Sequence, residues 1–106
     1  MHLNEICKRA HENAVEKGFW GEGGEGSMLR EAIAIGLIHT EVSELMEAHR
    51  AILGAERRLL AMAEELADVV VRCGDLAEHF GVDLDKEVRD KMRINTKRPA
   101  KHNKRY

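Results

Sequence analysis

Four acidic residues stand at the same spacing in two separate stretches of the chain. They are Glu41, Glu44, Glu65 and Asp68. The members of each pair are three residues apart, so a helix would place both carboxylates on one face, about one turn apart. Four carboxylates at one place repel each other unless a cation neutralises them, and ligands that are all oxygen favour Mg²⁺ or Mn²⁺ over zinc or copper. The spacing therefore predicts a divalent-metal site between two helices.

The first acidic pair lies on the apolar side of its helix. At the helical period, Glu41 and Glu44 fall within an apolar stripe. That stripe consists of Ile33, Leu37, Ala48 and Ile52. On the next helix, Glu65 borders the apolar stripe and Asp68 lies just outside it. Because a buried, unpaired carboxylate is costly, we expect a cation at a site that is deep at the first pair and open at the second.

Two other interpretations fit acidic pairs on helices. In the first, the carboxylates are exposed and pair with Arg57, Arg58 or Arg72, which is the usual state of a single acidic pair. Two pairs beside apolar stripes on neighbouring helices favour the metal instead. In the second, the chain is a di-iron protein, which requires Glu-x-x-His pairs. None of the six histidines follows a glutamate by three residues, so the sequence disfavours di-iron chemistry.

The acidic pairs lie in two of four predicted helices. Apolar residues at the helical period predict helices over residues 2–18, 27 to about 51–53, 56–80 and 83–94. The end signals are the N-caps Ser27 and Asp83 and the glycines Gly18, Gly54 and Gly81. Four helices with short connections predict a single domain over residues 1–106 with an all-α fold, an antiparallel four-helix bundle.

The net charge of −2 conceals two regions of opposite sign. Residues 1–85 hold eight Lys/Arg against seventeen Asp/Glu, a net charge of −9, whereas residues 86–106 hold nine against two, a net charge of +7. An acidic body with a basic end favours cation binding in one place and anion binding in another. The alternative for the basic tail, residues 95–106, is a solvated segment without a ligand.

Three further features bear on location and assembly. Cys7 and Cys73 are too few and too far apart for a disulfide framework, so we expect a reducing cytoplasm. No run approaches the roughly 18 apolar residues of a membrane span, so no membrane partner is expected. Opposite the acids, the second helix has another apolar face, formed by Ile35, Val42 and Met46. A helix that is apolar on two sides is buried on two sides, which predicts a homodimer or a larger homo-oligomer.

The acidic pairs and the basic end together resemble a known family. Glu41-Val-Ser-Glu44, followed after twenty residues by Glu65-Leu-Ala-Asp68, is similar to the paired acidic signature of the MazG-like all-α nucleoside triphosphate pyrophosphohydrolases. Lys91-Met-Arg-Ile-Asn95-Thr-Lys-Arg98-Pro99, followed by Lys101-His102, resembles that family's Lys…Asn…Arg-Pro segment. The Lys-Gly-Phe-Trp stretch at 17–20 resembles small members of the family. The resemblance spans nearly the whole chain.

The resemblance implies an enzyme that hydrolyses nucleoside triphosphates between the α- and β-phosphates. The products are a nucleoside monophosphate and pyrophosphate, and the implied role is house-cleaning of the nucleotide pool. Magnesium on the four acids would bind phosphate oxygens and activate a water molecule, with Glu41 or Glu44 as the catalytic base. The resemblance also implies homodimers or homotetramers in which neighbouring chains complete each nucleotide pocket.

The expected substrate-binding residues lie mostly in the basic end. Those expected at the phosphates are Lys91, Asn95, Lys97, Arg98 and His102. Trp20 could stack on the base or anchor a helix end, and packing favours the anchor. Asp75 could extend the acidic site, hold Lys91 or be a surface acid. The rival function is a non-enzymatic helical interaction module that binds nucleic acid through the basic tail.

Overall fold

The described residues of the computed structural model, 1–21 and 28–98, form four helices and short connections. These are α1 (Leu3–Glu16), α2 (Met28–Arg50), α3 (Ala55–His79) and α4 (Leu84–Lys97). No strand occurs in these two ranges, which confirms the all-α prediction. Each helix lies where the apolar period placed it, and α4 continues past residue 94, its predicted end. The predicted N-cap Ser27 lies outside the described residues.

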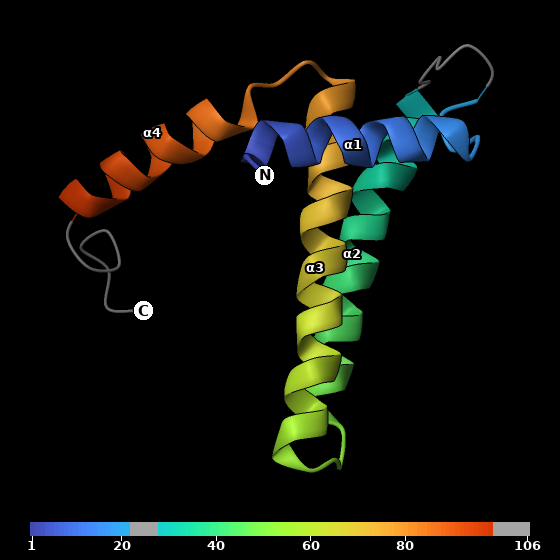
Figure 1. Ribbon diagram of the computed structural model, residues 1–106, viewed down its shortest axis with the longest axis vertical. Coiled ribbons are helices and arrows are strands. Elements are labelled where there is room, and N and C mark those ends of the chain that lie inside the picture. Colours follow the sequence, from blue (N-terminus) through green and yellow to red (C-terminus); the bar gives the residue numbers. More distant parts are fainter. Residues whose placement is uncertain (22–27, 99–106) are drawn as a thin grey trace.

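The helices form an open arrangement. Helices α2 and α3 make an antiparallel hairpin, α1 crosses α3 near one end of it, and α4 packs against α1 and extends away from the hairpin (Figure 1). In the simplest form of the predicted bundle, all four helices run side by side. The four helices of this chain do not. The radius of gyration is 16.5 Å, against about 13 Å for a compact domain of this length.

The glycines that end α1 and α3 match the sequence prediction, whereas Gly54, the predicted stop of the second helix, is the N-cap residue of α3. Gly18 after α1 and Gly81 after α3 have positive φ values of 83° and 70°. The amide that follows each glycine donates to the carbonyl five residues back, at 3.0 and 2.9 Å. Both helices thus end in the left-handed turn that glycine permits, and these turns satisfy carbonyls that the helix leaves open.

The direction of α4 is set by contacts between its first turn and the start of α1. Asp83 caps α4 by accepting a hydrogen bond from the Lys86 amide at 3.1 Å, which confirms the predicted N-cap. The Asn4 side chain donates to Asp83 at 2.8 Å and accepts from the backbone amide of Asp85 at 3.0 Å. These bonds hold the first turn of α4 beside α1 and explain why α4 does not lie along the hairpin.

Small residues form the contact between α1 and α3. Cys7 and Ala10 of α1 and Ala77 of α3 are buried. A Cβ added at Gly74 would lie 3.2 Å from the Cα of Cys7, closer than side chains normally approach a backbone. The absence of a side chain at Gly74 therefore lets the two helices cross at this short distance.

Much apolar surface stays uncovered in the single chain. Ile35, Val42 and Met46, the second apolar face predicted for α2, are 46%, 49% and 56% exposed. Ile33 on α2 and Val70 on α3 are about half exposed as well. With these residues exposed, this face of α2 is available to another protein surface.

None of the described helices combines the length and apolar character needed to cross a membrane.

Candidate functional site

Three of the four predicted metal ligands lie together between α2 and α3. Glu41 and Glu44 of α2 and Glu65 of α3 each offer a carboxylate oxygen, and these oxygens lie within 4.8 Å of one another. We call these three residues the carboxylate cluster. Glu41 is only 6% exposed, Glu65 is half-buried and Glu44 is exposed. The site is deep at Glu41, as expected. Glu44 is more exposed than its apolar stripe predicted, because of the described helices only α3 packs along this part of α2 (Figure 1).

Asp68, the fourth predicted ligand, lies outside the carboxylate cluster. It is exposed and lines a pocket of about 390 Å³ between α1 and α3. The polar lining comes from Asn13 and Lys17 at the end of α1 and from Asp68, Arg72 and Asp75 on α3. Since Asp68 is less than one turn from Glu65, the pocket and the carboxylate cluster are neighbours along α3.

Arg72 connects the two regions. Its Nε donates to Oε1 of Glu41 at 2.8 Å. Of the four predicted ligands, Glu41 therefore does pair with an arginine, as the alternative interpretation expected. The other carboxylate oxygen of Glu41, Oε2, is buried and has no hydrogen-bond partner among the described residues. Oε2 of Glu65 is in the same state. Two buried carboxylate oxygens without partners are uncommon in folded proteins and call for an explanation.

The charges of the carboxylate cluster are unevenly balanced. The hydrogen bond from Arg72 holds the pKa of Glu41 below its usual value. Burial, and then the neighbouring carboxylates of Glu44 and Glu41, raise the pKa of Glu65 to about 7. One guanidinium therefore does not compensate three carboxylates. The all-oxygen donor set and the two oxygens without partners fit a hard divalent cation such as Mg²⁺, with Glu41 and Glu65 as buried ligands.

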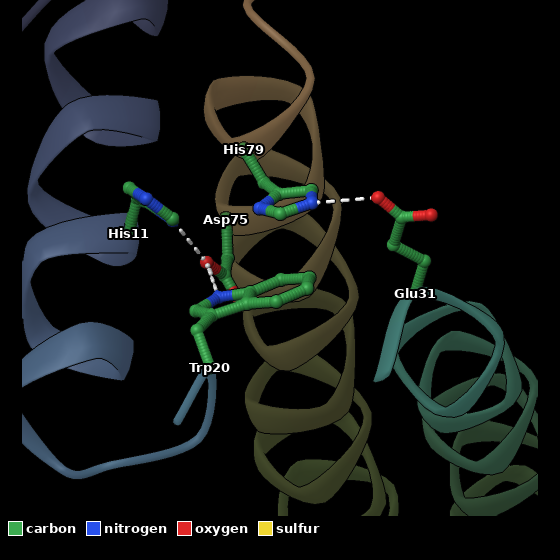
Figure 2. A network of polar contacts seen from close by, with 5 residues as sticks. All are labelled: His11, Trp20, Glu31, Asp75 and His79. Carbon is green, nitrogen blue, oxygen red and sulfur yellow. Dashed lines mark hydrogen bonds and ion pairs between the residues drawn. The ribbon is translucent and has the colours of Figure 1, made fainter. Parts of the chain in front are cut away.

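A second polar network joins α1, α2 and α3 around Trp20, which is completely buried. The Trp20 indole Nε1 donates to Oδ1 of Asp75 at 2.9 Å, and His11 Nδ1 lies 2.8 Å from the same oxygen (Figure 2). The His79 imidazole stacks on the indole, with 3.9 Å between ring centroids, and its Nε2 is 2.8 Å from Oε2 of Glu31 (Figure 2). The network fixes the segment after α1 against both helices of the hairpin.

This network bears on two of the sequence predictions. Trp20 has the contacts of an anchor, and its ring has no exposed surface. Asp75 accepts hydrogen bonds from Trp20 and His11, a role that none of its three sequence interpretations included. The sequence offered one signal for His11, which follows Cys7 by four residues and so shares the buried face of α1.

The basic residues expected at the phosphates lie apart from the carboxylate cluster of their own chain. Lys91, Asn95 and Lys97 are exposed on α4, and Arg98 directly follows it. Helix α4 packs against α1 and points away from the hairpin that carries the acids (Figure 1). His102 lies outside the described residues. The structure thus brings three predicted ligands together and leaves the predicted phosphate-binding residues of α4 apart from them.

Comparisons with protein-family models, with curated proteins and with solved structures gave no match. The resemblance to the MazG-like family therefore stays a prediction from the sequence motifs.

Proposed function

We propose that the protein is a magnesium-dependent nucleoside triphosphate pyrophosphohydrolase. It cleaves the acid anhydride between the α- and β-phosphates and releases a nucleoside monophosphate and pyrophosphate. The observation that carries the proposal is a pair of buried carboxylate oxygens, on Glu41 and Glu65, that have no hydrogen-bond partner in the described part of the chain and lie within one acidic cluster. Such oxygens are stabilised by a hard cation, and the acidic motifs that supply them are those that resemble the MazG-like family.

The role proposed for each acid of the site follows from its burial. Bound magnesium, or manganese in its place, supplies positive charge for phosphate oxygens and lowers the pKa of a coordinated water. Glu41 and Glu65 would hold the cation from the buried side, and Asp68, which lies outside the carboxylate cluster, would act beside it from the pocket. Glu44 is the better candidate for the base that orients and deprotonates the water, because it is exposed whereas Arg72 already holds Glu41.

The pocket beside Asp68 has room for part of the substrate. Its volume of about 390 Å³ and its mixed lining, with Phe19 and Val71 beside Asn13 and Lys17, suit a ligand that is apolar in one part and polar in another. A nucleotide whose phosphates meet the carboxylate cluster would place its nucleoside towards this pocket.

We include a homodimer or homotetramer in the proposal. The exposed apolar face of α2, formed by Ile35, Val42 and Met46, needs a cover that the single chain does not supply. Ile35→Lys should shift the assembly towards monomers in sedimentation equilibrium, and unchanged mass would exclude this face as the contact.

The catalytic proposal is tested by pyrophosphate release. Protein stripped of metal is assayed on a panel of canonical and damaged triphosphates, with and without Mg²⁺. Turnover should require Mg²⁺, and Glu44→Gln or Asp68→Asn should each lower it by at least about 100-fold without loss of helical circular dichroism. Glu47→Gln is the matched control, because Glu47 is an exposed acid on α2 that pairs only with Arg50 among the described residues.

Two outcomes would count against an enzyme. Full activity in Glu44→Gln or Asp68→Asn would show that the site is wrong. If no triphosphate yields pyrophosphate, the interaction module becomes the leading explanation. That function predicts salt-sensitive binding to DNA or RNA that survives substitution of the carboxylates.

A further inference from the structure

Arg72 contacts both the carboxylate cluster and the pocket. Its Nε donates to Oε1 of the buried Glu41 at 2.8 Å, while its side chain is 38% exposed and lines the pocket between α1 and α3. The sequence alone presents Arg72 as one of three arginines, with Arg57 and Arg58, that could pair with the acids. The structure gives it a more specific place, on one oxygen of the most buried of them.

The contact leaves the two oxygens of Glu41 in different states. Oε1 accepts the hydrogen bond from the guanidinium, and Oε2 is buried without a partner in residues 1–21 and 28–98. A charge-assisted hydrogen bond to one carboxylate oxygen fixes the rotation of the whole group, so it also fixes where the other oxygen points. Ligands of protein-bound metals are commonly held in this way by a neighbouring group, and loss of that group weakens metal binding.

We propose that Arg72 is a positioning residue that holds Glu41 so that its free oxygen faces a divalent cation in the carboxylate cluster. This inference rests on the metal site of the proposed function. It assigns Arg72 a role beyond the four acids, in which the arginine stays paired with Glu41 when the cation is bound.

A simple counter-ion role predicts the opposite effect on metal binding. If Arg72 only neutralised the acids, it would repel and compete with a cation, and its removal would tighten metal binding. The guanidinium is partly exposed, so solvent screens its repulsion. The carboxylate that it orients is buried, so no water replaces the lost hydrogen bond. We therefore expect the positioning effect to dominate.

The test is Mn²⁺ affinity without nucleotide, measured from the electron paramagnetic resonance signal of free Mn²⁺. Arg72→Met should raise the dissociation constant by about 10- to 100-fold. Arg72→Lys should raise it less, because a single ammonium keeps the charge but not the planar donor group. Arg50→Met is the control for loss of an arginine and should bind Mn²⁺ normally. Within the described ranges, Arg50 forms only an exposed pair with Glu47, at 3.4 Å.

A double variant shows whether Arg72 acts through Glu41. In a Glu41→Gln background, adding Arg72→Met should change Mn²⁺ affinity little, because the carboxylate to be positioned is gone. Should Arg72→Met alone lose helical structure, Arg72→Lys provides the comparison, with weaker Mn²⁺ binding expected. Equal or tighter binding in a folded Arg72 variant would overturn the positioning role alone. Wild-type protein that fails to bind Mn²⁺ would overturn the metal site and this inference with it.

Discussion

The indole of Trp20 lies flat on the imidazole of His79, with ring centroids 3.9 Å apart and planes 5° from parallel. Trp20 belongs to the segment after α1, and His79 is the last residue of α3. The two rings thus join the end of one helix to the end of another. Because Trp20 is the only tryptophan of the chain, its fluorescence reports on this junction alone.

Asp75 should contribute strongly to that junction. Asp75→Ala removes the acceptor shared by the Trp20 indole and His11, so the free energy of unfolding should fall by about 1–3 kcal/mol. Asp75→Asn keeps an oxygen acceptor and should cost less. Urea unfolding followed by tryptophan fluorescence measures both. A loss in Asp75→Ala no larger than that of a surface substitution would mean that the network does not stabilise the fold.

Glu65 should make the metal-free protein less stable as the pH rises from about 4.5 to 7. Burial raises its pKa to about 7 from the usual 4.5, so the folded state binds the proton more tightly than the unfolded state in this window. That stability is fully present below the unfolded pKa and is lost as the pH passes the folded one. Urea unfolding in chelator, compared between wild type and Glu65→Gln at each pH, isolates the effect from that of the histidines. If the free energy of unfolding depended on pH in the same way for the two proteins, the predicted contribution of Glu65 would be refuted.

Added Mg²⁺ should stabilise the wild type more than Glu65→Gln. A cation that binds only the folded state stabilises it by about 2.7 kcal/mol at a concentration 100 times the dissociation constant. Wild type should gain accordingly, whereas Glu65→Gln should gain much less because a ligand oxygen is lost. Thermal unfolding across a Mg²⁺ titration provides the measurement, with Glu47→Gln as the variant that should respond like wild type. An equal gain in Glu65→Gln would place bound Mg²⁺ elsewhere.

Gly74 and Gly36 should respond differently to alanine. In a helix, Gly→Ala stabilises by about 1 kcal/mol. Gly36 on α2 has nothing within 4 Å of an added Cβ, so Gly36→Ala should show this gain. At Gly74 the added Cβ would lie 3.2 Å from the Cys7 backbone, so α1 must move and the gain should be lost or reversed. Urea midpoints compare the two variants. An equal gain at both positions would show that α1 moves freely on α3.

Local features of the fold were predictable from the sequence, and the position of α4 was not. The apolar period, the terminal glycines and the Asp83 cap act within one helix, so each can be recognised in a short stretch of sequence. The position of α4 depends on the bond from Asn4 to Asp83, which are 79 residues apart. Neither residue belongs to a sequence pattern that would indicate this contact.

The same distinction applies to the candidate site. The spacing of Glu41, Glu44 and Glu65 correctly predicted that these acids converge. The placement of Asp68 at the pocket depends on how far α3 is rotated against α2, which separate analysis of each helix cannot fix. The pairing of Arg72 with Glu41 depends on that rotation as well.

The crossing of α1 over only one end of the hairpin has a consequence for local unfolding. Near Gly74 and Ala77 the hairpin is covered by α1, whereas at the opposite end Ile52 is fully exposed in the turn that joins α2 to α3. Amide hydrogen exchange should therefore be slowest where α1 crosses and fastest towards that turn. The carboxylate cluster lies between these extremes, on backbone that can fray from the open end without unfolding the junction around Trp20.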